Sequence, residues 1–195
     1  MRRPLFFDTE TTGVRPEQDR IVEIAVYDLH QQKSFCELIN PKMSIPKDAI
    51  SVHGITDSMV SQMPHFSSIG KKLIEFCSGE IALIGHNCDA FDVPFLKAEF
   101  ARNGLLFPSH WVFIDSLKWA RKYRRDLPRH ALQFLRQMYG IEPNQAHRAL
   151  ADVMVLSEVF QMMTDDLTCD EIITLLGYNI PLPEKKPVEA LQLFT

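Results

Sequence analysis

The chain has 195 residues, 46% of them hydrophobic, which is enough for one well-buried globular domain and too few for a large multidomain protein. The net charge of −4 argues against a protein that coats long duplex DNA, because non-specific affinity for nucleic acid comes mainly from Lys and Arg contacts to phosphates. The apolar run Leu5–Phe7 is far too short for a signal-peptide core or a membrane span, and the four cysteines form no CxxC pair. We therefore expect a cytoplasmic protein without membrane association, disulfides or a zinc site.

The first third of the chain predicts strands followed by a helix. Residues 4–8, 20–29 and 34–40 are apolar or alternate apolar with polar positions, which predicts a three-strand meander. Residues 41–64 contain three prolines and a glycine, so we expect a loop there. In residues 66–77 the apolar side chains recur on one helical face, which predicts a helix that packs on the core.

The rest of the chain alternates strands with helices. A buried strand is predicted at 81–86, and a helix runs from about Asp92 to Gly104, with a proline in its first turn. The later predicted elements are a strand at 111–115 and helices at roughly 116–123, 130–139 and 148–164. This order predicts the α/β class, with a mixed sheet covered by helices on both faces.

Four carboxylates lie where this fold would bring them together. Asp8 and Glu10 leave the first strand, Asp92 begins a helix, and Asp152 lies near the start of the last long helix. Strand ends and helix starts converge on one edge of an α/β sheet. Clustered carboxylates repel one another unless cations neutralise them, and their oxygens suit Mg²⁺ or Mn²⁺. Taken singly, Asp92 could be a helix cap, Asp152 a partner of the helix dipole and Glu10 a turn residue.

A basic stretch follows in residues 118–136, which hold seven Lys or Arg and one Asp, a local charge of +6. Such a run is commonly a solvated helix face. Beside an acidic site it could instead contact phosphates, and Arg121, Lys122 and Arg124 are the candidate contacts.

Three motifs resemble those of the DEDDh exonuclease family, which includes epsilon-type proofreading subunits, RNase T, oligoribonuclease and the TREX nucleases. The motifs are DTETTG, the HN and FDVPFL of residues 86–96, and HRALAD, and the resemblance covers roughly residues 4–164. VHGIT at 52–56 and VFIDSLKWARK look like connecting segments of epsilon-type members. The resemblance implies an RNase H-like fold with a five-stranded mixed sheet flanked by helices.

The resemblance also implies the roles of the motif residues. Asp8, Glu10, Asp92 and Asp152 match the carboxylates that bind two Mg²⁺ or Mn²⁺ ions, and His147 matches the general base. His147 stands five positions before Asp152, which is the spacing of the histidine subfamily. The chemistry implied is hydrolysis of the terminal phosphodiester at a 3′ end, with release of a nucleoside 5′-monophosphate.

The second motif departs from the epsilon pattern. Three residues, 88–90, separate HN from FD, whereas epsilon-type sequences usually have two. This spacing is similar to the TREX type. It makes Asp89 a carboxylate that could compete for metal, and it weakens an assignment to a replicative proofreader.

The resemblance further implies contacts to the terminal nucleotides. Small residues after the first acidic pair let the backbone approach a ligand closely, and stacking or apolar contact holds unstacked bases. Among the apolar candidates, Ile55 is the expected contact, whereas Phe91 and Phe95 are expected in the core; His86 is a weaker candidate than its neighbour Asn87. The expected nucleic-acid contacts outside the basic stretch are Thr9, Thr11, Thr12, Gly13, Ile55 and Asn87.

The division of the chain follows from where the resemblance ends. We expect an exonuclease domain at 1–165, a C-terminal helical extension at 166–180 and a flexible tail at 181–195. The tail ends in ALQLF, which resembles the sliding-clamp-binding peptide of bacterial replication and repair proteins but has Ala in place of the preferred Gln. Leu191, Leu193 and Phe194 could bind a clamp, or they could fold back onto the domain or form a homodimer contact.

Three functions are consistent with these features. The first is a metal-dependent 3′–5′ exonuclease acting on single-stranded DNA ends in proofreading or repair, with a polymerase catalytic subunit or sliding clamp as an expected partner. The second applies the same chemistry to RNA or short oligoribonucleotides, since recognition of the 2′-hydroxyl depends on pocket shape. The third is a non-catalytic polymerase-associated scaffold, which the intact set of five motif residues disfavours.

Overall fold

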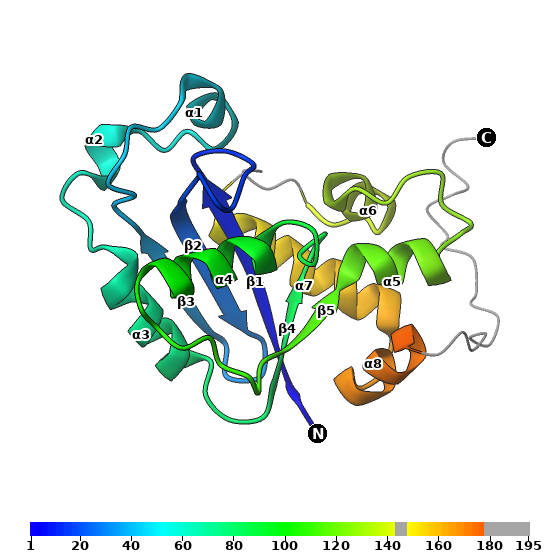
Figure 1. Cartoon of the computed structure of the whole chain (residues 1–195). Helices are drawn as coiled ribbons and strands as arrows, with labels where there is room; N and C mark the ends of the chain where they lie inside the picture. The colour runs from blue at the N-terminus through cyan, green and yellow to red at the C-terminus, as the bar shows by residue number, and fades with distance from the viewer. Residues whose placement is uncertain (143–147, 178–195) are drawn as a thin grey trace.

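The computed structural model describes residues 1–142 and 148–177, and a five-stranded sheet forms its centre (Figure 1). The strands are β1 (Arg3–Thr11), β2 (Ile21–Asp28), β3 (Lys33–Leu38), β4 (Ile81–Gly85) and β5 (Val112–Asp115), in the spatial order β3-β2-β1-β4-β5. β1, β2 and β3 are antiparallel neighbours, whereas β1, β4 and β5 are parallel. The predicted mixed sheet of the RNase H-like fold is therefore confirmed.

Eight helices accompany the sheet in the described part of the chain. They are α1 (Lys47–His53), α2 (Asp57–Val60), α3 (Phe66–Phe76), α4 (Asp92–Arg102), α5 (Ser116–Tyr123), α6 (Leu132–Met138), α7 (Ala149–Thr164) and α8 (Cys169–Gly177). Figure 1 shows α3 and α4 on one face of the sheet and α7 on the other. The described residues include no helix that is both long and apolar enough to span a membrane.

Alternation along β1 divides the core into two layers. Phe6 belongs to the core formed with α7, where its ring packs edge-on against Phe160. Leu5 and Phe7 point to the opposite face and belong to the core formed with α3 and α4. Because successive side chains of a strand point to opposite faces, Asp8 and Glu10 continue the row of Phe6 toward α7.

The prediction of a loop at 41–64 is wrong, because this segment contains α1 and α2. These helices have only seven and four residues, too few for a helical period to stand out in the sequence. Gly54 ends α1 with φ of 73°, a left-handed conformation that glycine adopts without strain. α1 lies above the carboxyl end of β1 in Figure 1, and its residues Ala49, Val52 and His53 line a cavity described below.

The helical extension begins with α8, which packs on the same core as α7 through Cys169 and Ile172. Asp170 pairs with Arg2 near the N-terminus. The carbonyl of Leu175 accepts hydrogen bonds from Lys122 Nζ at 2.6 Å and from the Tyr123 hydroxyl at 2.8 Å. The boundaries at 165 and 180 remain predictions, and the tail at 181–195 lies outside the described residues.

Candidate active site

Three carboxylates meet where β1 ends and α7 begins. Asp8 and Glu10 lie two residues apart on β1 and face α7, and Asp152 lies in the first turn of that helix. Oxygens of all three carboxylates lie within 4.8 Å of one another. The motif residues from the two ends of the chain thus converge on one point.

Asp92 reaches the same place from the other face of the sheet. It begins α4, is 3% exposed, and accepts hydrogen bonds from Thr9 N at 3.1 Å and Thr9 Oγ1 at 2.6 Å. Together with Asp8, Glu10 and Asp152, it lines a cavity of about 400 Å³. Thr9 lines this cavity too, but its side chain is 4% exposed and its hydroxyl is bound to Asp92, so its expected nucleotide contact stays a prediction.

The electrostatics of this cluster are unfavourable for free carboxylates. Burial, reinforced by the charges of Asp92 and Glu10, raises the pKa of Asp8 well above its usual range. Burial and the charge of Asp152 raise the pKa of Glu10 to about 8, and burial raises the pKa of Asp92 to about 7. Hard divalent cations would neutralise this oxygen-only donor set, so the residues fit the two Mg²⁺ or Mn²⁺ ions expected from the motifs.

Gln133 on α6 is a site residue that the sequence did not reveal. Its Nε2 donates to Asp152 Oδ1 at 3.1 Å, and its Oε1 accepts from Arg136 Nε at 2.9 Å. It also lines the 400 Å³ cavity. A lone glutamine carries no motif signal, so only the packing of α6 against α7 identifies it. His147, the expected base, lies outside the described residues.

A second cavity of about 510 Å³ adjoins the first and shares Glu10, Val52 and Phe91 with it. Thr11, Thr12 and Gly13 line this second cavity, and their contact with a terminal nucleotide stays a prediction. Their contacts are local: Thr11 Oγ1 donates to Gly13 O at 2.6 Å, and Thr12 Oγ1 accepts from Arg20 N at 3.0 Å.

Gly13 also makes a close approach to another residue of its loop. A Cβ there would lie 2.5 Å from the carboxylate of Asp19, which accepts a hydrogen bond from Arg15 N at 2.9 Å. A larger residue at position 13 would therefore push the Asp19 carboxylate out of its present position.

A hydrogen bond from His53 joins α1 to the end of β1. Its Nδ1 accepts from Ile55 N at 3.0 Å, so its Nε2 carries the proton and donates to Thr11 O at 3.2 Å. Ile55 itself is fully buried with Val22 and Val60, so the expectation of a base contact there is corrected. The VHGIT segment thus positions the cavity wall through a histidine whose role the sequence did not indicate.

The turn between β4 and α4 forms the opposite wall. Asn87 is exposed, has φ of 65° and donates its backbone N–H to Asp115 Oδ1 at 3.0 Å. His86 Nδ1 lies 2.9 Å from Ser116 Oγ, and burial lowers the pKa of His86 to about 4, which keeps the ring neutral. Both residues line the 400 Å³ cavity, and Phe91 lines both cavities, whereas Phe95 is fully buried as expected.

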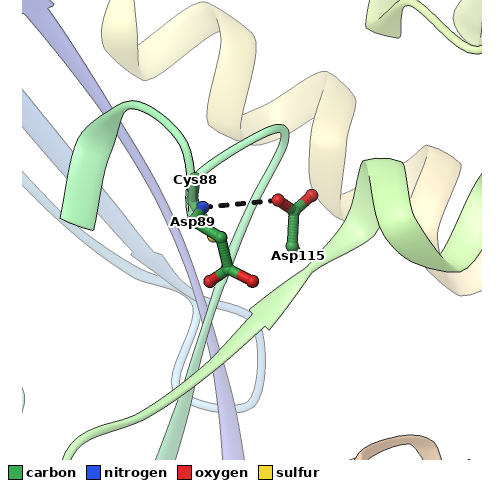
Figure 2. Close-up of side chains that lie close together, drawn as sticks. All are labelled: Cys88, Asp89 and Asp115. Atoms are coloured by element: carbon green, nitrogen blue, oxygen red, sulfur yellow. Dashed lines mark hydrogen bonds between the residues drawn. The ribbon is translucent and has the colours of Figure 1, made fainter. Parts of the chain in front are cut away.

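Asp89 belongs to a different cluster from the motif carboxylates. Figure 2 shows it beside Cys88 and Asp115, at the start of α5. Its backbone N–H donates to Asp115 Oδ2 at 3.3 Å, and its carboxylate forms an ion pair with Lys118. That Asp89 competes for the metal stays a prediction; its ion pair with Lys118 and its distance from the Asp8, Glu10 and Asp152 group argue against it.

The basic stretch divides into inward and outward residues. Arg124 is 4% exposed, pairs with Asp126 and lies with its guanidinium over the Tyr139 ring, so its expected phosphate contact is corrected. Lys122 is bound to the carbonyl of Leu175. Arg121 and Arg125 remain exposed.

Comparisons with known proteins agree with this geometry. The model of the exonuclease family (RNase_T) matches residues 5–160. The chain is 33% identical over 176 residues to the chloroplast and mitochondrial exonuclease DPD1 of Arabidopsis thaliana, covering 82% of this chain and 55% of that protein. It is 37% identical over 162 residues to the DNA polymerase III subunit epsilon of Treponema pallidum, covering 80% of this chain and 74% of that subunit.

Solved structures share the fold. A zinc-bound complex of E. coli exonuclease I with single-stranded DNA aligns with a TM-score of 0.74 at 21% identity, over 89% of this chain and 43% of that one. Exonuclease X bound to duplex DNA with a 5′ overhang aligns with a TM-score of 0.66 at 25% identity, over 89% and 99%. The chain thus spans about half the length of some relatives and nearly all of another. It belongs to the exonuclease family and contains the DEDDh-type nuclease domain of that family.

Proposed function

We propose that this protein is a 3′–5′ exonuclease that removes nucleoside 5′-monophosphates from single-stranded DNA ends and depends on Mg²⁺ or Mn²⁺. The observation that carries the proposal is the convergence of Asp8, Glu10 and Asp152 within 4.8 Å, on a cavity that Asp92 also lines. Four acidic groups with an open cavity beside them fit a two-cation phosphodiesterase site better than a structural one.

Each residue has a stated task in this proposal. Asp8, Glu10, Asp92 and Asp152 would hold two divalent ions, which supply charge neutralisation of the phosphate and acidify the attacking water when bound. His147 would accept the proton of that water, as its motif position implies. Thr9 and Gln133 hold Asp92 and Asp152 in place, and the 510 Å³ cavity is wide enough to receive the terminal nucleotide.

DNA is the proposed substrate because of the named relatives. The Treponema relative is a DNA polymerase III subunit, and the structural neighbours are described as complexes with single-stranded or overhanging DNA. The same names favour a role in proofreading or repair, with a polymerase catalytic subunit as a partner. RNA hydrolysis by the same site is the competing outcome.

The test compares two oligonucleotides of one sequence, one DNA and one RNA, each labelled at its 5′ end. We expect the DNA to shorten from its 3′ end one nucleotide at a time, with kcat/KM at least tenfold above that for RNA. Equal or faster degradation of the RNA would replace the proposed substrate. A label released from the 5′ end at the first step would contradict the direction.

A further inference from the structure

The N-terminus of α7, which carries Asp152, has no cap of its own. Arg148 occupies the N-cap position with an extended backbone and makes no side-chain cap to the helix. The first N–H groups of a helix have no partner within the helix, and Ala149, the first residue of α7, is fully buried. Its N–H therefore needs an acceptor from another part of the protein.

Glu23 on β2 supplies that acceptor. Its side chain is buried, with 1% of the residue exposed, and its Oε2 accepts from Ala149 N at 3.0 Å. The same carboxylate accepts from Arg148 Nη2 at 2.8 Å and from Arg148 Nε at 3.3 Å. One carboxylate thus binds both the backbone and the guanidinium at the start of α7, and we call this group of contacts the Glu23 anchor.

The Glu23 anchor lies between two of the metal-binding carboxylates. Glu23 stands directly opposite Glu10 in the β1–β2 pairing, next to a register shift at the end of β1. In α7, Asp152 N donates to Arg148 O at 3.0 Å. Arg148, which Glu23 binds, therefore also accepts the backbone hydrogen bond of Asp152. A displacement of Arg148 would therefore also shift Asp152, because one backbone hydrogen bond joins the two residues.

The negative charge of Glu23 is compensated by the positive charge of Arg148. Like charges directly opposite on neighbouring strands destabilise a sheet, and Glu23 faces Glu10 in this way. The guanidinium of Arg148 offsets the added negative charge without entering the cavity. A neutral residue at position 23 would avoid the repulsion, but it would lose the two charge-assisted hydrogen bonds between the carboxylate and the Arg148 guanidinium.

We propose that Glu23 is a positioning residue that sets the distance of Asp152 from Asp8 and Glu10 by anchoring the first turn of α7. This inference rests on the proposed function, since it assigns Glu23 a role in metal binding and turnover. Residues that orient metal ligands through such contacts typically change metal affinity or activity by about 10- to 100-fold when they are replaced.

The experiment uses Glu23→Gln and Arg148→Met, with Asp28→Asn as the matched control. Asp28 lies at the other end of β2, is also 1% exposed, and likewise binds an arginine, Arg3, and a backbone N–H, that of Gln31 at 3.0 Å. Mn²⁺ affinity is measured by calorimetric titration, and kcat and KM are measured separately on single-stranded DNA. Thermal unfolding reports the stability of each variant.

We expect Glu23→Gln and Arg148→Met to weaken Mn²⁺ binding or lower kcat by about 10-fold or more, with KM for DNA unchanged. Asp28→Asn should lower the unfolding temperature and leave both readouts at the wild-type values. If Glu23→Gln does not fold, Arg148→Met decides alone, since the Arg148 side chain is 35% exposed.

Wild-type Mn²⁺ affinity and kcat in the folded Glu23→Gln and Arg148→Met proteins would overturn the positioning role. An equal loss in Asp28→Asn would overturn it as well, because the effect would then be one of general stability. If the wild type binds Mn²⁺ but does not hydrolyse DNA, the proposed function fails, and the calorimetric comparison still tests the Glu23 anchor.

Discussion

At the scale of single residues, the carboxylates that are expected to bind metal also destabilise the metal-free protein. The raised pKa of Asp8 has burial as its main cause and neighbouring carboxylates as the next, so its charge destabilises the metal-free protein. We expect Asp8→Asn to stabilise the metal-free protein by about 1–2 kcal/mol at neutral pH and to reduce turnover by roughly 10³-fold or more. Chemical unfolding in EDTA and an exonuclease assay measure the two effects.

The control for Asp8→Asn is Glu75→Gln, which removes an exposed carboxylate of α3 that takes no part in the cluster. It should leave stability and activity unchanged. A metal-free Asp8→Asn protein that is less stable than the wild type would show that repulsion does not govern the cluster.

The pH dependence of stability follows from the same residues. The folded-state pKa values of Glu10 and Asp92 rise from ordinary acidic values to about 8 and about 7, so the folded protein binds more protons than the unfolded chain above pH 4.5. The free energy of unfolding of the metal-free protein should therefore fall as pH rises from about 5 to 8. Saturating Mn²⁺ should remove this decline, and denaturant unfolding at several pH values measures it. A metal-free stability that increases over this range would contradict the assignment.

The motif residues could be predicted from the sequence because their spacing is specific to a family. The structure brings Asp8, Glu10 and Asp152 together as predicted. Glu23, His53 and Gln133 could not be predicted, since each acts through a contact to a distant backbone or side chain. Ile55 was misplaced for the converse reason: a residue beside a motif can be part of the core, and burial depends on the tertiary fold.

At the scale of elements, the stretch from α5 to α6 contains both a buried arginine and exposed arginines, which its net charge alone could not distinguish. Arg124 is held between Asp126 and Tyr139, whereas Arg121 and Arg125 face solvent. We expect Arg124→Gln to destabilise the protein by about 2 kcal/mol, because it breaks a buried set of contacts. Denaturant unfolding measures this cost, and a change below about 0.5 kcal/mol would contradict the structural role.

The outward arginines carry the remaining prediction of phosphate contact. Replacing both Arg121 and Arg125 by Gln should leave stability unchanged, weaken DNA binding and flatten its dependence on salt concentration. Binding titrations at several salt concentrations measure the slope, with Arg124→Gln as the comparison. An unchanged slope would make these residues a solvated helix face.

The elements differ in how well the sequence indicated them. The strands and the helices from α3 to α7 were all predicted within a few positions, and α3, α4 and α7, with 11 to 16 residues, are long enough for their hydrophobic period to stand out. α1 and α2 are shorter than a reliable period and lie among prolines, so they were predicted as a loop. Their importance comes from His53, which joins α1 to the end of β1.

At the scale of the whole molecule, the topology explains how residues 144 positions apart become neighbours. β1 lies in the middle of the sheet, and α7 crosses the face to which Asp8 and Glu10 point (Figure 1). The α4 side supplies Asp92 over the end of the same strand. The α/β class and all five strands followed from the sequence pattern, whereas the RNase H-like arrangement of the sheet required the family resemblance.

The tail carries a prediction about assembly. Residues 181–195, which lie outside the described part of the chain, contain ALQLF, and we expect this peptide to bind a bacterial sliding clamp weakly because Ala190 replaces the preferred Gln. A binding titration with the peptide measures this, beside a Leu193→Ala, Phe194→Ala control peptide. The absence of saturable binding at high micromolar concentration would leave a fold-back or dimer contact as the function of these side chains.

The central claim is that the carboxylates on β1, α4 and α7 form a metal-dependent nuclease site. The most direct measurement is a time course with a 5′-labelled single-stranded DNA oligonucleotide, in Mg²⁺, in Mn²⁺ and in excess EDTA, with Asp8→Asn and Glu75→Gln in parallel. We predict stepwise shortening from the 3′ end with either ion, by the wild type and Glu75→Gln, and none in EDTA or with Asp8→Asn. Undiminished cleavage in EDTA, or full activity of Asp8→Asn, would contradict the claim.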